Sequence, residues 1–187
     1  QQWKIDTNGQ NVTFVSGLSG TGSSLTKSGS GTLTLTAVNS YTGDTTIGAG
    51  TLRLIDSGVL GSGNYSGAIA NSGTLQYSST SAQTLSGIIS GTGGVLIKDT
   101  SSSTLTLTGL NSYSGGTTVS AGTLQVGNGG SGGTLGSGDI TNNATLVVSK
   151  NVNTTLSNVI SGTGTMTAII TGSAQSLTIS GAIGQSG

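Results

Sequence analysis

The side chains that perform most acid–base and nucleophilic catalysis are scarce in this sequence. Its 187 residues include no His and no Cys, which excludes Ser-His-Asp catalysis, Cys-His catalysis and thiolate metal sites. The acidic residues are all Asp and lie far apart in the sequence: Asp6, Asp44, Asp56, Asp99 and Asp139. Because glycoside hydrolysis needs two converging carboxylates, we interpret them as isolated, solvated turn acids and predict that the chain is not an enzyme.

The Gly-rich stretch at residues 127–139 has a faint likeness to the Ca²⁺-binding nonapeptide array. Calcium requires about six or more oxygen ligands, and a single occurrence of the stretch with one Asp cannot supply them. We therefore predict no metal site and no cofactor.

Charge and hydropathy exclude two further classes of partner. The formal net charge is zero and the five Lys and Arg residues are nowhere adjacent, so the sequence offers no basic patch for nucleic acid. It also contains no apolar run of about 18 residues, so we expect no membrane insertion by this segment.

The composition could be that of a disordered linker, because 35 Gly, 31 Ser and 32 Thr make up about half of the chain. Three features favour an ordered protein instead. The apolar residues, 32% of the chain, are placed periodically; Pro is absent; and no net charge keeps the chain open.

Two stretches 72 residues apart have nearly the same sequence. Residues 32–54 (TLTLTAVNSYTGDTTIGAGTLRL) return as residues 104–126 (TLTLTGLNSYSGGTTVSAGTLQV), with 15 of 23 aligned positions identical. Flanking matches extend the copies to about residues 14–84 and 85–155, with a partial third copy at 156–187. Such a period marks a repeat array, in which each unit buries its apolar face on the next copy.

Apolar and polar residues alternate within each copy, which predicts β-strands with one inward face. The inward positions are Leu33, Leu35, Leu52, Leu105, Leu107 and Leu124. Thr34 and Thr106, which lie between inward leucines, are predicted to face outward. Corners between the strands are expected at the repeat glycines: Gly43, Gly50, Gly115 and Gly122.

Apolar strand centres recur about every 7 to 10 residues, so three strands per coil predict coils of roughly 20 to 25 residues. Each 72-residue repeat would then form about three coils, with equivalent positions stacked rung on rung. A hairpin arrangement is less favoured, because the one Asn-Gly pair, Asn8-Gly9, lies outside the repeat. We predict an all-β chain, a right-handed parallel β-helix of about eight rungs over residues 1–187.

Two polar positions recur in the repeat and allow two interpretations each. Asn39 and Asn111 either satisfy turn backbone from inside or bind an external ligand, and we favour the internal role. Tyr41 and Tyr113 either stack on sugars or cover the end of the core with a wetted hydroxyl, and we favour the second.

The repeat body also has a family signature. It is carried in the first copy by residues 27–35, 39–43, 45–47 and 49–52, and in the second by residues 98, 104–108, 111–113, 115, 117–119 and 121–124. This pattern resembles the passenger-associated transport repeat of bacterial autotransporters. The second copy departs from it at residues 99–103 (DTSSS), and the third has lost the Asn-Tyr-Gly positions. The resemblance implies a β-helical stalk in a longer passenger, exported through a C-terminal barrel and then surface-exposed or released.

Two functions are consistent with these observations. The first is a non-catalytic structural and adhesive segment of a passenger, secreted or on the bacterial outer-membrane surface. It would act as a stalk, self-associate through the sides or ends of the β-helix, or contact a host or matrix glycan. The second is a surface binder for ice or polysaccharide that uses outward Thr ladders such as Thr32-Leu33-Thr34.

Overall fold

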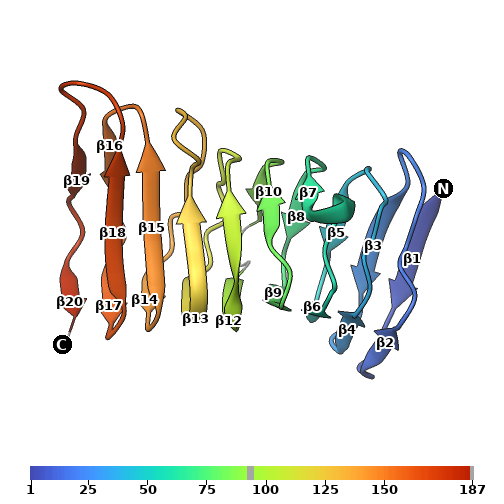
Figure 1. The fold of residues 1–187 in the computed structure, drawn as a ribbon. Coiled ribbons are helices and arrows are strands. Elements are labelled where there is room, and N and C mark those ends of the chain that lie inside the picture. The colour runs from blue at the N-terminus through green and yellow to red at the C-terminus, as the bar shows by residue number, and fades with distance from the viewer. Residues whose placement is uncertain (92–94, 186–187) are drawn as a thin grey trace.

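In the computed structural model the chain forms a parallel β-helix, seen as side-by-side strands from the N-terminal to the C-terminal coil in Figure 1. The structure describes residues 1–91 and 95–185, and the side chains of residues 95, 97, 100–102 and 185 are likewise outside the description. Residues 92–94 of the predicted second copy and residues 186–187 of the partial third copy therefore lie outside the described residues. Every strand pair in the described residues is parallel, so the all-β parallel β-helix predicted from the sequence is confirmed.

The strands form three rows along the rod. Row A consists of β1 (Gln2–Asp6), β3 (Ser24–Ser28), β5 (Thr45–Ile47), β8 (Ile69–Asn71) and β11 (Ile89–Ser90). Row B consists of β2 (Val12–Phe14), β4 (Thr32–Leu35), β6 (Thr51–Asp56), β9 (Thr74–Ser79), β12 (Val95–Leu107), β13 (Thr117–Val126), β14 (Ile140–Asn142), β17 (Ile160–Gly162) and β20 (Ile183–Gln185).

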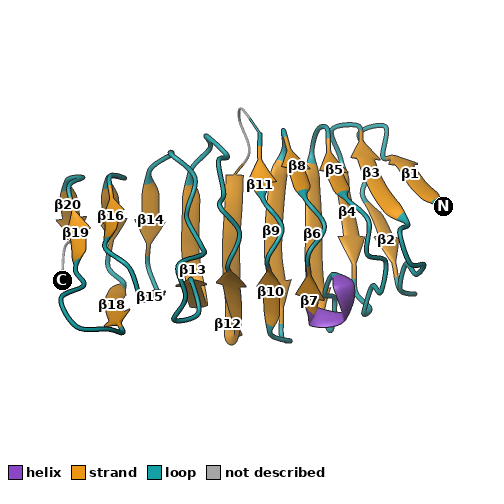
Figure 2. Ribbon diagram, turned by 90° about the horizontal axis from the view of Figure 1, so that it is seen from above, coloured by secondary structure: helices purple, strands orange, loops and turns teal. Residues whose placement is uncertain are grey.

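Row C consists of β7 (Asn64–Tyr65), β10 (Gln83–Leu85), the C-terminal halves of β12 and β13, β15 (Thr145–Lys150) and β18 (Thr165–Ile170). The long strands β12 and β13 pass around a corner and join rows B and C into one sheet, with register shifts on either side of Asp99. β16 (Thr154–Leu156) and β19 (Leu177–Ile179) form a separate pair. The one helical element described is the short 3-10 turn η1 (Gly61–Gly63), drawn in purple in Figure 2.

Each coil takes 19 to 24 residues, from Leu33↔Leu52 at the short end to Thr45↔Ile69 at the long end. This range agrees with the predicted coil of roughly 20 to 25 residues. Nine strands in row B are separated by eight steps, which gives about eight coils. The rung count predicted from the sequence is confirmed.

The 72-residue repeat does not close after a whole number of coils. In row B the cross-strand partners of Leu33 in the next three coils are Leu52, Leu75 and Leu96. Leu105, the second copy of Leu33, lies nine residues beyond Leu96, on the part of β12 that belongs to row C. The expectation that equivalent positions stack rung on rung is therefore wrong. A repeat contains three coils and one further strand, so the second copy is turned onto the next row.

Alternation along the strands fills the core with leucine, isoleucine, valine and tyrosine side chains. Thr34 lies next to Thr13 and Arg53 on the neighbouring strands and is only 8% exposed, whereas Thr106 is half-buried. Thr34 alternates with the inward Leu33 and Leu35, but the neighbouring strands cover it, so its outward position is not a solvent-exposed one. No helix in the described part of the chain is long and apolar enough to cross a membrane.

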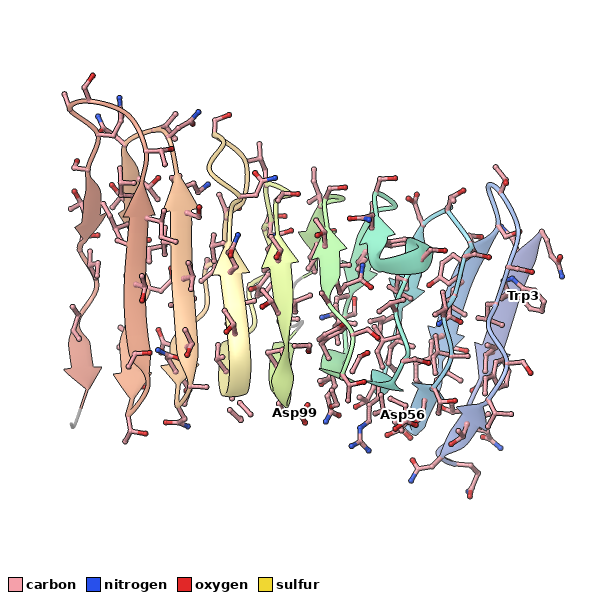
Figure 3. All side chains as sticks on the ribbon, in the orientation of Figure 1. Trp3, Asp56 and Asp99 are labelled. Carbon is pink, nitrogen blue, oxygen red and sulfur yellow. The ribbon has the colours of Figure 1, made fainter. Side chains whose placement is uncertain are left out.

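Apolar cavities open at both ends of the rod. One of about 260 Å³ is lined at the C-terminal coil by Ile160, Met166 and Ile183, with other apolar residues. Another of about 400 Å³ is lined at the N-terminal coil by Trp3 and Phe14, and Figure 3 labels Trp3 on β1.

Candidate functional site

The repeat leucines form the floor on which the rest of the motif is built. All six are 0% or 1% exposed: Leu33, Leu35, Leu52, Leu105, Leu107 and Leu124. Direct cross-strand partners join Leu33 to Leu52 in row B and Leu105 to Leu124 in row C. The same contact is therefore made twice, on two different rows.

Asn39 and Asn111 connect three successive coils. Asn39 Oδ1 accepts a hydrogen bond from the Leu18 N–H (2.9 Å), and its Nδ2 donates to Val59 O (3.1 Å) and to Ala37 O. Asn111 Oδ1 likewise accepts from the Ile89 N–H (2.8 Å), and its Nδ2 donates to Thr134 O (2.7 Å). Each side chain thus satisfies a backbone group one coil before it and one coil after it, and the internal role predicted for this Asn is confirmed.

Tyr41 and Tyr113 are fully buried, and each hydroxyl is 2.7 Å from the Oγ1 of the threonine four residues later, Thr45 or Thr117. The tyrosines cover the core as expected, but the prediction of a wetted hydroxyl is wrong. Burial raises the pKa of both phenols. The threonine reaches the hydroxyl because its strand starts directly after the corner.

The four repeat glycines lie at corners of the coil. Gly50 and Gly122 adopt φ values of +65° and +69°, a region that favours residues without a Cβ. Gly43 lies against backbone carbonyls of the preceding coil, and Gly115 lies directly beside Gly138 of the following coil. The motif glycines therefore allow close approach between coils.

Three buried lysines were not predicted from the sequence. Lys27 and Lys98 are 0% exposed and Lys150 is 3% exposed. Lys27 Nζ donates to Thr7 Oγ1 (3.1 Å), Ser28 O (3.0 Å) and Gly29 O (2.6 Å). Desolvation lowers the pKa of all three ammonium groups, and Asp6 offsets part of that shift at Lys27.

Lys98 and Lys150 occupy two different surroundings. Lys98 Nζ lies 5.8 Å from the centre of the Tyr77 ring, in the range of a cation–π contact. Lys150 Nζ donates to the carbonyls of Ser131 (3.3 Å), Gly132 (2.6 Å) and Gly133. It thereby holds the Gly-rich loop in which the second copy has extra residues. The alternation of the strands could have indicated that these lysines point inward. A charged side chain is ordinarily expected at the surface, however, so their burial was not predicted from the sequence.

The five acids were predicted to lie apart from one another. In the described residues no group of three or more His, Cys, Asp or Glu side chains could hold a metal ion. Asp56 of β6 and Asp99 of β12 both lie on the lower side of the rod in Figure 3, on strands that are separated by β9. Asp99 accepts hydrogen bonds from Gln76 Nε2 (2.6 Å) and Ser78 Oγ, so the prediction of an isolated, solvated acid is wrong at this position.

Tyr65 is the largest feature of the first copy that sequence reasoning missed. Its ring meets the Tyr41 ring edge-to-face, with the ring centres 5.6 Å apart. Its hydroxyl is 2.8 Å from Thr45 Oγ1 and donates to Gly43 O. Burial raises its pKa to about 12. The second copy has no equivalent residue, so repeat comparison gave no signal for it.

Comparison with known proteins agrees with this geometry. The family model for the passenger-associated transport repeat matches residues 25–54 and 100–126, the two segments that hold the Asn, Tyr and Leu positions described above. The chain carries two passenger-associated transport repeats. The family resemblance inferred from the sequence is thereby confirmed.

A curated relative extends the similarity beyond the two repeats. The adhesin BmaC autotransporter of Brucella suis biovar 1 (strain 1330) is 37% identical over 163 residues. The match covers 76% of this chain and 5% of the relative, so this chain spans a small part of that protein's length. No solved structure matches the chain.

Proposed function

We propose that this chain is a non-catalytic structural and adhesive segment of an autotransporter passenger, exported to the bacterial surface or released. The observation that carries the proposal is the inward use of the repeat motif. Its Leu, Asn and Tyr side chains join one coil to the next, and none remains exposed for chemistry. The repeat therefore serves to build a rod, and its outer surface is left for contacts.

The outer surface supports a role in neutral contacts. The chain has ten charged residues, and three of its lysines are buried, so few charges oppose the approach of another surface. Ser and Thr hydroxyls can both donate and accept hydrogen bonds. We propose as partners a second rod, met through its sides or ends, or a hydroxyl-rich host or matrix glycan. Neither nucleic acid nor the membrane interior offers matching chemistry.

The test is display of this chain on the surface of a non-adherent bacterium, followed by cell settling and adherence to immobilised glycans. A displayed β-helix of the same length with a different outer surface is the control. Faster settling or greater adherence than the control is expected. Behaviour identical to the control in both assays would leave a stalk role and overturn the adhesive one.

A second function, a Thr-ladder surface binder for ice or polysaccharide, has one observation in its favour. Thr104, Thr123, Thr145 and Thr165 are direct cross-strand partners in four successive coils of row C. The equivalent column of the first copy, Thr32, Thr51 and Thr74, belongs to row B and faces another side of the rod. Because a flat crystal surface could meet one column at a time, we rank this function second; thermal hysteresis in solution would favour it.

A further inference from the structure

A groove of about 400 Å³ lies beside the second repeat copy, between the coil at residues 133–137 and strand β16. Its inner wall contains the core residues Val126, Leu135 and Leu156, and its mouth contains the exposed Ser112 and Ser137. No charged side chain lines it. No such groove is found at the equivalent place of the first copy among the cavities described, although the first copy has the same Leu-Gly-Ser-Gly sequence there.

The sequence explains the difference between the copies. From Leu60 the first copy reads Leu-Gly-Ser-Gly-Asn-Tyr-Ser-Gly-Ala-Ile, and from Leu135 the second reads Leu-Gly-Ser-Gly-Asp-Ile. Four residues, Asn-Tyr-Ser-Gly at positions 64–67, therefore have no counterpart between Gly138 and Asp139. In the first copy these residues include β7 and the buried Tyr65.

In the first copy β7 completes the sheet next to β10. Asn64 and Tyr65 pair in parallel with Thr84 and Leu85, and the Ser86 N–H donates to Tyr65 O (2.8 Å). Gln83 satisfies both backbone groups of Leu60: its Oε1 accepts a hydrogen bond from the Leu60 N–H (2.7 Å), and its Nε2 donates to Leu60 O (3.2 Å). Figure 2 shows β7 and η1 together on this side of the rod.

The second copy lacks this closure at Leu135, although Asn158 Nδ2 donates to the neighbouring carbonyls Gly136 O (2.8 Å) and Gly138 O (2.7 Å). β16, the counterpart of β10, pairs only with β19 on its C-terminal side within the described residues. Thr154 replaces Gln83, and its hydroxyl donates to Val152 O instead of reaching Leu135. In the described part of the chain neither the N–H nor the C=O of Leu135 makes a hydrogen bond. The groove therefore contains an open strand edge above an apolar floor.

We propose that this groove binds an extended, uncharged peptide segment of another polypeptide that carries a tyrosine, added in parallel to β16. Strand addition to an exposed sheet edge takes its affinity from backbone hydrogen bonds and its specificity from side-chain pockets. The first copy identifies the occupant, since Asn64 and Tyr65 of the chain itself fill the equivalent place. The uncharged lining matches a neutral segment, and the new strand would continue the existing β16–β19 ladder. This inference is independent of the adhesive function proposed above.

The experiment uses the whole chain and a synthetic peptide with the sequence of residues 62–68, Ser-Gly-Asn-Tyr-Ser-Gly-Ala. Titration followed by amide NMR shifts should perturb Leu135 and the β16 residues and leave β10 unchanged. The same peptide with Ala in place of Tyr should bind at least about tenfold more weakly, because it buries no aromatic side chain.

Two variants test the site itself. Insertion of Asn-Tyr-Ser-Gly between Gly138 and Asp139 should fill the groove from within and abolish peptide binding. If that insertion variant does not fold, Ser137→Trp blocks the groove mouth from an exposed position, and Ser114→Trp, exposed but outside the groove, is the matched control. Absence of peptide binding, binding that survives both blocking variants, or binding of a neutral oligosaccharide in place of the peptide would overturn the proposal.

Discussion

The two repeat copies use the same motif and differ in what they build around it. In both, Leu pairs, an Asn that bridges coils and a Tyr–Thr hydrogen bond hold the rod together. The first copy adds Tyr65 against Tyr41, whereas in the second Gly136 lies against Tyr113. The inward motif fixes the coil, so insertions and deletions accumulate at corners, where they change the surface and leave the ladder intact.

Truncation of one core leucine in each copy should have the largest effect. Leu52→Ala and Leu124→Ala should each lower the free energy of unfolding by about 2–5 kcal/mol, because both side chains are fully buried. Urea denaturation measures both, and Thr106→Ala, half-buried on the outer face, should stay within about 0.5 kcal/mol. A threonine cost equal to the leucine cost would contradict the assignment of inner and outer faces.

The bridging asparagines should come next, and here the copies should differ. Asn39→Ala leaves the Leu18 N–H unpaired, while Val59 O keeps its bond from the Asn39 N–H (2.9 Å). Asn111→Ala leaves both the Ile89 N–H and Thr134 O without a partner. At about 1–3 kcal/mol per unpaired buried group, Asn111→Ala should destabilise more.

Asn111→Asp is the companion variant, since it keeps the acceptor for the Ile89 N–H and removes the donor to Thr134 O. It should fall between wild type and Asn111→Ala in the same urea denaturation series. Equal costs for the two alanine variants would show that solvent repairs Thr134 O.

Alkaline pH should destabilise the first copy more than the second. Burial raises the pKa of Tyr65 and Tyr77 to about 12, and it raises those of Tyr41 and Tyr113 as well. A phenol whose folded pKa is raised contributes stability that is complete below its unfolded pKa of about 10 and is lost as the pH rises toward 12.

Urea denaturation between pH 9 and 12 measures this loss of stability, and the tyrosinate absorbance recorded in parallel shows when the phenols ionise. The buried lysines act in the opposite sense, because a lowered folded pKa makes their contribution complete above about 10.5 and smaller at lower pH. Tyr65→Phe should flatten the alkaline loss of stability relative to the unmodified chain, because it removes a buried phenol whose pKa is raised to about 12. Tyrosinate formation before any loss of structure would contradict the burial argument.

Sequence reasoning reached the coil length, the rung count and the inward leucines, because alternation and period report directly on the ladder. It missed the one-row turn of the second copy, since a 72-residue period does not reveal how many strands it contains. It also missed the burial of Lys27, because a charged side chain is expected to lie in solvent. The backbone carbonyls that accept its hydrogen bonds become visible only in the structure. The groove was not predicted either, because it results from four residues of the first copy that have no counterpart in the second.

The smallest effect should come from Lys150, whose ammonium holds the loop at residues 127–133. Lys150→Met removes three bonds to loop carbonyls, but it also removes the cost of burying a charge. The free energy of unfolding should therefore change by no more than about 1 kcal/mol. The loop should respond locally, with lower NMR order parameters at residues 130–133, while Gly127 stays ordered through its N–H bond to Leu107 O (2.8 Å). Lys27→Met is the first-copy comparison: its carbonyl partners lie at a regular corner next to the strand, so the corner should stay ordered. Equal loosening at both places would mean that the loop of the second copy is held no differently from an ordinary corner.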